Sequence, residues 1–333
     1  MALAASVSED SSRASTAAIV GWLAGVVLGL VLAVAAVLKS LDPHGFAEAI
    51  AAQHAAFGLP PFAAALVALG IEAALGIALV LDLRRRSVMI AASVLVAFFL
   101  ALTGNEAWRA AHGVVDSAGC GCFGNLVLRT PRQALFQDLG LLVPPLVLAW
   151  LGRPGARRAL TLRWSLVAGF AIATVAFAAV APRLPLDDVA TRLRPGVAVA
   201  DLCAGTGAAR VCLPAAAPAV ATGKHLVVIA DAATPGFPEL AARLNDYLEK
   251  GSGPGVVVLA DVTPDEQQAM FWSIAPAFDL QPTPQALLRP LYRSLPRSFE
   301  VDAGRVVATW SGLPPQIPPA ATKGAAHVSP EKP

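Results

Sequence analysis

Residues 14–38 read ASTAAIVGWLAGVVLGLVLAVAAVL, a stretch without a single charged side chain. About 20 consecutive apolar residues in a helix cross the hydrocarbon core of a bilayer, so this stretch is long enough to span one. A cleaved signal peptide has a shorter apolar core, of about 7–15 residues, behind a basic start. Residues 1–12 carry two acids and no base, so we expect a helix that stays in the mature protein as an anchor.

Four further stretches have few or no charged residues, and each is long enough to span a bilayer. They are Phe57–Leu81, Ser87–Asn105, Leu135–Gly152 and Trp164–Pro182. The charged residues inside them are Glu72 and Asp138. The sequence therefore predicts an α-helical membrane bundle of five spans.

The composition of the whole chain excludes an ordinary soluble globule. Of its 333 residues, 56% are hydrophobic and 14% are charged, whereas soluble domains carry about 25% charged residues. A net charge of +2 gives no argument for nucleic-acid binding. Four cysteines in a chain of this length exclude a small disulfide-held domain, but they leave room for redox pairs or a metal site.

Basic residues predict the orientation of the spans. Three arginines lie at 84–86 and four lie within 153–163, in the loops after the second and fourth spans. Loops rich in Lys and Arg stay in the cytoplasm, which places the N-terminus there as well. The segment 106–137 and everything after Pro182 then face the outside. We expect a multi-pass protein of the bacterial inner membrane with a periplasmic C-terminal domain.

The composition changes after the fifth span, and this change defines the expected domains. Residues 1–15 form a cytoplasmic N-terminus, and 16–182 form the five-span membrane domain. Residues 183–199 form a linker, 200–315 an outer α/β domain, and 316–333 a disordered tail rich in Pro, Ala and charge.

The outer domain shows the alternation of an α/β fold. Val-rich apolar runs at His225–Asp231 and Val256–Asp261 are typical of buried parallel strands. Between them Pro238–Lys250 has helical spacing, and Thr263, followed by Pro and two acids, marks a helix start. Residues 298–310 predict two strands joined by a tight turn.

The chemistry is concentrated at Cys120-Gly-Cys122-Phe-Gly, in the expected outer loop that also contains Glu106. A disulfide across one intervening residue closes a small, strained ring that is easily reduced, and glycine supplies the backbone freedom it needs. Such a pair suits thiol–disulfide exchange on an oxidising face. A static turn bridge, or half of a metal site, stays open as an alternative, although we expect no metal.

Cys203 and Cys212 lie nine positions apart at the entrance of the outer domain. They fit either a structural disulfide that closes a surface loop or a relay that exchanges with the Cys120–Cys122 pair. Their spacing does not choose between the two.

Glu72 stands in the middle of a span. An ionisable group there is costly and normally faces the bundle interior or a cavity. Glu72 could carry protons, bind a quinone headgroup, or make a hydrogen bond between helices, and these alternatives stay open. Lys39 and Asp42, at the outer end of the first span, are interpreted as an interfacial anchor and a helix stop.

Several of these residues together resemble the MauE branch of the DoxX-like membrane proteins, named for methylamine utilisation. The resemblance covers roughly residues 15–182. It rests on Leu38-Lys-Ser-Leu-Asp-Pro43, on Glu72, on the five-residue motif at 120–124 and on Asp138. It implies a four-helix membrane core with the fifth span as a connector. It also implies a role in maturing or transporting periplasmic disulfide-rich proteins such as methylamine dehydrogenase subunits.

The outer domain resembles the thioredoxin-like fold. The run at 225–231 occupies the position before a thioredoxin active site, where this chain reads Thr234-Pro-Gly-Phe237 instead of Cys-Pro-x-Cys. Thr283–Pro284 stands where thioredoxins place their cis-proline. A thiolate is the required nucleophile, so the resemblance implies the fold but no thioredoxin catalysis by this domain.

Two functions follow from these observations. The first is a membrane thiol–disulfide oxidoreductase, in which Cys120 and Cys122 exchange electrons with periplasmic client dithiols; a membrane quinone is one candidate for the electron acceptor, which the sequence does not identify. The second is a non-catalytic maturation or transport factor whose outer domain binds the client. Beyond the quinone we expect no cofactor.

Overall fold

The computed structural model describes residues 2–83, 86–112, 130–152, 160–205, 210–251 and 253–317, with side chains from residue 16 onward except at 160. The chain divides into two compact units. The helical unit contains residues 1–193, 202–211 and 285–293, and the α/β unit contains residues 194–201, 212–284 and 294–333.

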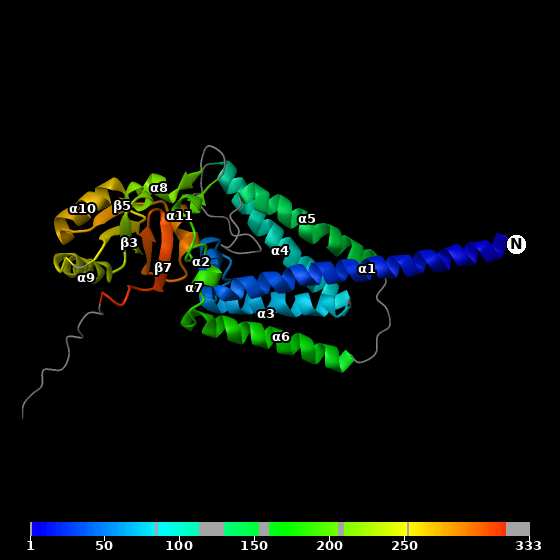
Figure 1. Cartoon of the computed structure of the whole chain (residues 1–333). Helices are drawn as coiled ribbons and strands as arrows, with labels where there is room; N and C mark the ends of the chain where they lie inside the picture. The colour runs from blue at the N-terminus through cyan, green and yellow to red at the C-terminus, as the bar shows by residue number, and fades with distance from the viewer. Residues whose placement is uncertain are drawn as a thin grey trace, which may run out of the picture. The chain divides into compact units, whose positions relative to one another are not determined.

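The helical unit is built from helices that pack alongside one another (Figure 1). They are α1 (Ala2–Leu41), α2 (Pro43–Ala52), α3 (Pro61–Val80), α4 (Arg86–Ala111), α5 (Pro131–Leu151) and α6 (Leu160–Val180). In the described part of the chain, five helices are long and apolar enough to cross a membrane: α3 to α6 and the part of α1 from Thr16. The five predicted spans are thus confirmed as helices, each close to its predicted place.

The outward face of α1 is apolar. Large apolar side chains at helical spacing are exposed on it: Ile19, Leu23, Val27, Leu30 and Val34. A face of this kind would be costly in water but is covered by lipid when the helix spans a bilayer, whose apolar core accepts helices of this composition. The protein is therefore a multi-pass membrane protein.

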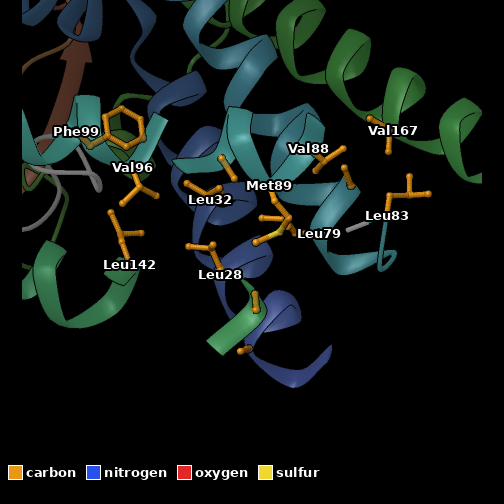
Figure 2. Packing of buried hydrophobic residues seen from close by; sticks show 14 residues of the cluster. Leu28, Leu32, Leu79, Leu83, Val88, Met89, Val96, Phe99, Leu142 and Val167 are labelled. Atoms are coloured by element: carbon orange, nitrogen blue, oxygen red, sulfur yellow. The ribbon is translucent and has the colours of Figure 1, made fainter. Parts of the chain in front are cut away.

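The interior of the bundle is filled by apolar side chains from neighbouring helices (Figure 2). Leu28 and Leu32 of α1 pack in one cluster with Leu79 of α3, Val96 of α4 and Leu142 of α5. Each of these side chains is at most 2% exposed. The cluster also contains Val167 of α6, so it joins all five spans into one packed core, and the fifth span is more than the connector that the resemblance implies.

Helices α1 and α3 approach each other at two glycines. A Cβ atom added to Gly76 would lie 2.7 Å from the backbone nitrogen of Ala33, and one added to Gly29 would lie 2.5 Å from the carbonyl oxygen of Gly76. Both distances are shorter than any non-bonded contact a real Cβ makes. Glycine at these positions is what permits the close packing, as is common between membrane helices.

Helix α4 extends beyond the end that the sequence predicts. The sequence predicts Glu106 in the loop after the third span, but α4 continues to Ala111 and Glu106 is a helical residue that is 5% exposed. The reason is local, because the residues from Glu106 onward are mostly good helix formers and contain neither Gly nor Pro before the helix ends.

Short elements complete the helical unit. They are η2 (Ala181–Arg183), α7 (Asp187–Ala190), β1 (Cys203–Ala204), α11 (Gln285–Leu288) and η6 (Arg289–Leu291). The segment 285–293 lies in sequence between two strands of the α/β unit, but it belongs to the helical unit.

The α/β unit is organised around a five-stranded sheet with the order β5-β4-β3-β6-β7. Its strands are β3 (Lys224–Ile229), β4 (Gly255–Ala260), β5 (Asp279–Pro282), β6 (Arg297–Asp302) and β7 (Arg305–Ser311). β3, β4 and β5 are parallel, whereas β6 and β7 are antiparallel to their neighbours. The helices of this unit are η3 (Val199–Asp201), α8 (Leu213–Ala216), η5 (Pro218–Ala221), α9 (Phe237–Glu249) and α10 (Pro264–Ile274), and the short strand β2 (Val211–Cys212) contains the point in the sequence where the two units divide.

The strands predicted from Val-rich runs are found in the parallel part of this sheet. Leu226 and Val228 of β3 pack with α9, while Val227 and Ile229 are buried as well. Strands covered on both faces lose the alternation of a half-exposed strand, which is why these runs are nearly continuous. The predicted hairpin is confirmed, and its turn has positive φ at Ala303 (47°) and at Gly304 (74°).

Helix α10 begins with a reciprocal cap. The hydroxyl of Thr263 accepts a hydrogen bond from the backbone N–H of Glu266 at 3.3 Å, and the Glu266 carboxylate accepts one from the Thr263 N–H at 2.8 Å. The Thr263 hydroxyl also donates to this carboxylate at 2.9 Å, and the bonds from the Thr263 N–H and hydroxyl lower the pKa of Glu266 from its ordinary value of 4.5. The predicted helix start at Thr263 is confirmed.

Replacing Thr263 with Ala should destabilise the α/β unit by about 1 kcal/mol, because the first turn of α10 loses its side-chain acceptor. Folding lowers the pKa of Glu266, so the carboxylate of Glu266 stabilises the folded state fully above pH 4.5. This stabilisation is lost as the pH falls from 4.5 through the lower folded-state pKa. Glu266→Gln is the control, because Gln also completes a capping box but does not titrate. Chemical unfolding of the full chain at pH 7 and pH 3.5 measures both effects. An equal acid sensitivity of the wild type and Glu266→Gln would contradict the assignment.

Candidate functional site

Lys39 and Glu72 form a buried ion pair between α1 and α3. The Nζ atom of Lys39 donates to both carboxylate oxygens of Glu72, at 2.9 Å to Oε1 and 2.8 Å to Oε2. The two side chains are 4% and 1% exposed. Both charges have lost their hydration, so each depends on the other for its stabilisation.

Aromatic rings complete the surroundings of the ammonium group. The Nζ atom of Lys39 lies 4.5 Å from the ring centroid of Phe99 on α4 and 5.1 Å from that of Phe46 on α2. The π face of an aromatic ring attracts a cation at these distances. One ammonium group on α1 is therefore contacted from α2, α3 and α4.

The interruption of the helix between α1 and α2 positions Phe46. α1 ends at Leu41, and the Oδ1 atom of Asp42 accepts a hydrogen bond from the Gly45 N–H at 3.0 Å, which caps α2. Asp42 is thus the helix stop that the sequence predicts. The interpretation of Lys39 as an interfacial anchor is wrong, because its side chain is in the interior and paired with Glu72.

Further polar groups are buried in the same bundle. The Nε2 atom of Gln53, after α2, donates to Oε1 of Glu106 on α4 at 2.5 Å. Asp138 on α5 is 1% exposed, and the Thr103 hydroxyl on α4 donates to the carbonyl of Phe99 at 3.0 Å. Buried carboxylates therefore come from three spans, although an acidic group in a span is costly.

The Lys39–Glu72 pair supports two kinds of chemistry. As a fixed ion pair it joins α1 to α3. As a proton site it allows transfer of one proton from the ammonium to the carboxylate, which leaves two neutral groups and no net change of charge. The helix–helix contact expected for Glu72 is present, and proton transfer and quinone binding stay hypotheses.

The Cys120–Cys122 pair lies outside the described residues. The helices before and after it are described: α4 ends at Ala111, and α5 begins at Pro131. Thr130 and Gln133 form a capping box at the start of α5.

Cys203 and Cys212 are both disulfide-bonded, and the strands β1 and β2 that carry them pair with each other. The Nη1 atom of Arg192 donates to the carbonyl oxygen of Cys203 at 2.8 Å, and Nη2 of Arg210 lies 3.3 Å from its sulfur. An oxidised state fits both a structural disulfide and a relay, so the two interpretations of this pair stay open.

The residues in the thioredoxin active-site position follow β3. Thr234 donates through its hydroxyl to the Asp231 carbonyl at 2.8 Å, and Phe237 is the first residue of α9 and 2% exposed. Thr234 stabilises a turn, and Phe237 packs in the hydrophobic core. Among the described residues the cis peptide bond is Leu295–Pro296, directly before β6, and not the expected Thr283–Pro284.

Helical spacing agrees with the inward position of both residues of the ion pair. Leu28, Leu32 and Ala36 are each at most 1% exposed, and Lys39 follows them on the same side of α1. On α3, Leu69 precedes Glu72 in the same way and is fully buried. Extending each buried stripe by one turn places both charged residues inward, but the sequences of α1 and α3 are apolar on every side, so only the structure shows which stripe is buried.

A comparison with known families matches residues 17–151 to the model of Methylamine utilisation protein MauE. The match covers less than half of the chain; it includes most of α1 and all of α2 to α5. The match confirms the predicted resemblance to MauE over residues 17–151, but the expected MauE-like region extended to residue 182, so the fifth span lies outside the match. The comparison with curated proteins found no match.

Proposed function

We propose that the chain is a thiol–disulfide redox or maturation factor of the bacterial inner membrane, of the MauE type, that acts on periplasmic disulfide-containing proteins through Cys120 and Cys122. The observation that carries this proposal is the MauE match at 17–151, because it contains this cysteine pair together with the helices on both sides. The name of the matched family adds methylamine utilisation as the process.

In the oxidising direction, a client thiolate attacks one sulfur of the Cys120–Cys122 disulfide, breaks the S–S bond and forms a mixed disulfide. A second client thiolate then attacks the client sulfur of the mixed disulfide. The client leaves with a new disulfide, and Cys120 and Cys122 are left reduced by two electrons. A membrane quinone is the proposed acceptor: it takes these two electrons and two protons and becomes a quinol.

The intramembrane pair offers a place for the protons of this cycle. Glu72 lies in a span and accepts two hydrogen bonds from Lys39 in an apolar interior. Residues that carry protons in membrane proteins are typically buried ionisable groups facing the bundle interior. In our proposal Glu72 exchanges a proton while the thiols are oxidised.

The α/β unit is proposed to be thioredoxin-like and to hold the client. Its central strand β3 is followed by a turn and α9, and strand β6 pairs with β3 in the antiparallel direction. The position of a thioredoxin thiol pair is taken by Thr234 and Phe237, so the unit would bind substrate without reacting.

Thiol trapping in spheroplasts tests the redox role and the orientation together. Cys120→Ser leaves Cys122 free to hold a client as a mixed disulfide, which should appear as a higher-mass adduct that a reductant removes. A Cys120→Ser/Cys122→Ser variant should give no adduct, and Cys203→Ser/Cys212→Ser is the matched control on the other pair. A membrane-impermeant maleimide should reach Cys122 from outside.

The same experiment identifies the alternative. A non-catalytic maturation factor is favoured by the α/β unit, whose expected active-site position contains no thiol. If the Cys120–Cys122 pair stays oxidised under mild reductant and no adduct forms, exchange chemistry is excluded. Labelling of Cys122 only after the membrane is permeabilised would reverse the proposed orientation.

A further inference from the structure

Arg289 of the segment 285–293 is bound to α2. Its Nη2 atom lies 2.9 Å from Oε2 of Glu48 and 3.5 Å from Oδ2 of Asp42, and its Nη1 atom donates to the carbonyl oxygen of Tyr292 at 3.0 Å. The Arg289 side chain is 11% exposed. The planar guanidinium group can serve several acceptors at once, so one buried side chain holds both the cap and the middle of α2.

A glycine makes room for this contact. A Cβ atom added to Gly45 would lie within 2.2 Å of Nη2 of Arg289 and 2.3 Å of Oδ2 of Asp42. Arg289 therefore lies directly against the backbone of the first turn of α2.

The segment that carries Arg289 has its own attachment away from α2. The Nη2 atom of Arg293 donates to the Ala181 carbonyl at 2.7 Å, and its Nη1 atom donates to that of Leu184 at 3.2 Å. These carbonyls follow the C-terminal end of α6, where the helix dipole favours a cation. The Arg192 N–H donates to the Pro290 carbonyl at 3.0 Å. The segment is thus held in place without help from α2.

The opposite side of α2 covers the ion pair. Phe46 places its ring 5.1 Å from the Nζ atom of Lys39, and Ala47 and Ile50 are buried in a cluster with Ala65 of α3. Asp42, the N-cap of α2, and Glu48 within α2 instead contact Arg289. α2 is consequently held between an apolar contact on the bundle and an ionic contact on the segment.

The connection after α2 is suited to a hinge. Residues 53–59 form turns between α2 and α3, and His54, Phe57 and Gly58 in this connection have positive φ. Motion of α2 can therefore be taken up there, without unwinding α3.

We propose that Arg289 is a latch that keeps α2 closed as a lid over the Lys39–Glu72 pair. When Arg289 is released, α2 moves away, Phe46 leaves the ammonium group, and water and small hydrophilic molecules reach Lys39. This inference concerns access to the ion pair and is independent of any reaction at Cys120 and Cys122.

The test uses the full chain in lipid nanodiscs with two measurements. Arg289→Ala should raise amide hydrogen exchange in 43–52 at least tenfold, and it should raise modification of Lys39 by a charged amine reagent by a similar factor. Lys250, which is exposed, is the internal reference for the reagent. Arg305→Ala is the matched control, because Arg305 is an exposed arginine that bonds to the Gly196 carbonyl and not to α2.

A variant on the other side of the contact tests the mechanism. Asp42→Asn/Glu48→Gln removes both charges, but Asn keeps the capping oxygen of α2. It should open the lid as far as Arg289→Ala does, and the combined variant should add little, because both changes break one interaction. Unchanged exchange in 43–52 with unchanged Lys39 labelling would overturn the proposal. A uniform rise of exchange across all helices would also overturn it, because it would show a structural role only.

Discussion

Glu72→Gln will destabilise the helical bundle by about 3–5 kcal/mol, because it leaves the Lys39 ammonium buried without a counter-charge. The neutral amide can accept from Nζ, but it cannot balance the charge that both carboxylate oxygens of Glu72 now contact within 2.9 Å. The rings of Phe46 and Phe99 compensate for only a part of this loss, since a cation–π contact contributes about 0.5–2 kcal/mol. Unfolding by a denaturing detergent, followed by circular dichroism, measures the change.

A double replacement separates a structural ion pair from a proton site. Lys39→Met/Glu72→Met removes both charges and keeps similar volumes, so the bundle should recover most of the stability lost in Glu72→Gln. If the pair only joins α1 to α3, this variant keeps full activity in client maturation. If the pair carries protons, the variant folds but loses that activity.

Thr103→Val is the control for a change in buried polarity alone. The Thr103 hydroxyl donates to the Phe99 carbonyl within its own helix. Its loss should therefore cost no more than about 1–2 kcal/mol. If Glu72→Gln were as mild as Thr103→Val, the ion pair would contribute little to stability and the assignment of a strong buried interaction would be wrong.

Structural features that are determined by residues close together in the sequence could be predicted from the sequence. The five spans follow from the length of each apolar run, and the start of α10 follows from Thr263, Pro264 and the acids after it. The parallel strands follow from continuous Val-rich runs, and the hairpin follows from Ala303–Gly304. Each of these signals acts over a few residues, where physical preferences are strong.

Features that depend on distant residues could not be predicted in this way. The sequence places Lys39 at the end of a span, whereas its position on the buried side of α1 determines its surroundings. Arg289 meets Asp42 across most of the chain, and no local pattern connects them. The cis bond at Pro296 could not be chosen over Pro284 either, because both are X–Pro bonds and the fold selects between the isomers.

Gly76→Ala will destabilise the bundle by about 1–3 kcal/mol, although Ala is the better helix former. The added Cβ would lie 2.7 Å from the Ala33 nitrogen and 2.9 Å from the Gly29 carbonyl oxygen. These are backbone atoms of α1 and cannot rotate away as a side chain would, so α1 and α3 have to separate. Because Lys39 and Glu72 are on the same two helices, the separation also stretches the ion pair.

In the matched control variants, replacing glycine by alanine should increase stability instead of reducing it. Gly104 of α4 and Gly169 of α6 are helical glycines, and an added Cβ would meet no atom within 4 Å at either position. Gly104→Ala and Gly169→Ala should therefore stabilise their helices by up to about 1 kcal/mol. Detergent unfolding of the three variants under one set of conditions makes the comparison direct. If Gly76→Ala were as stable as the controls, α1 and α3 would not be in contact at this point, and the ion pair that bridges them would lose its main structural support.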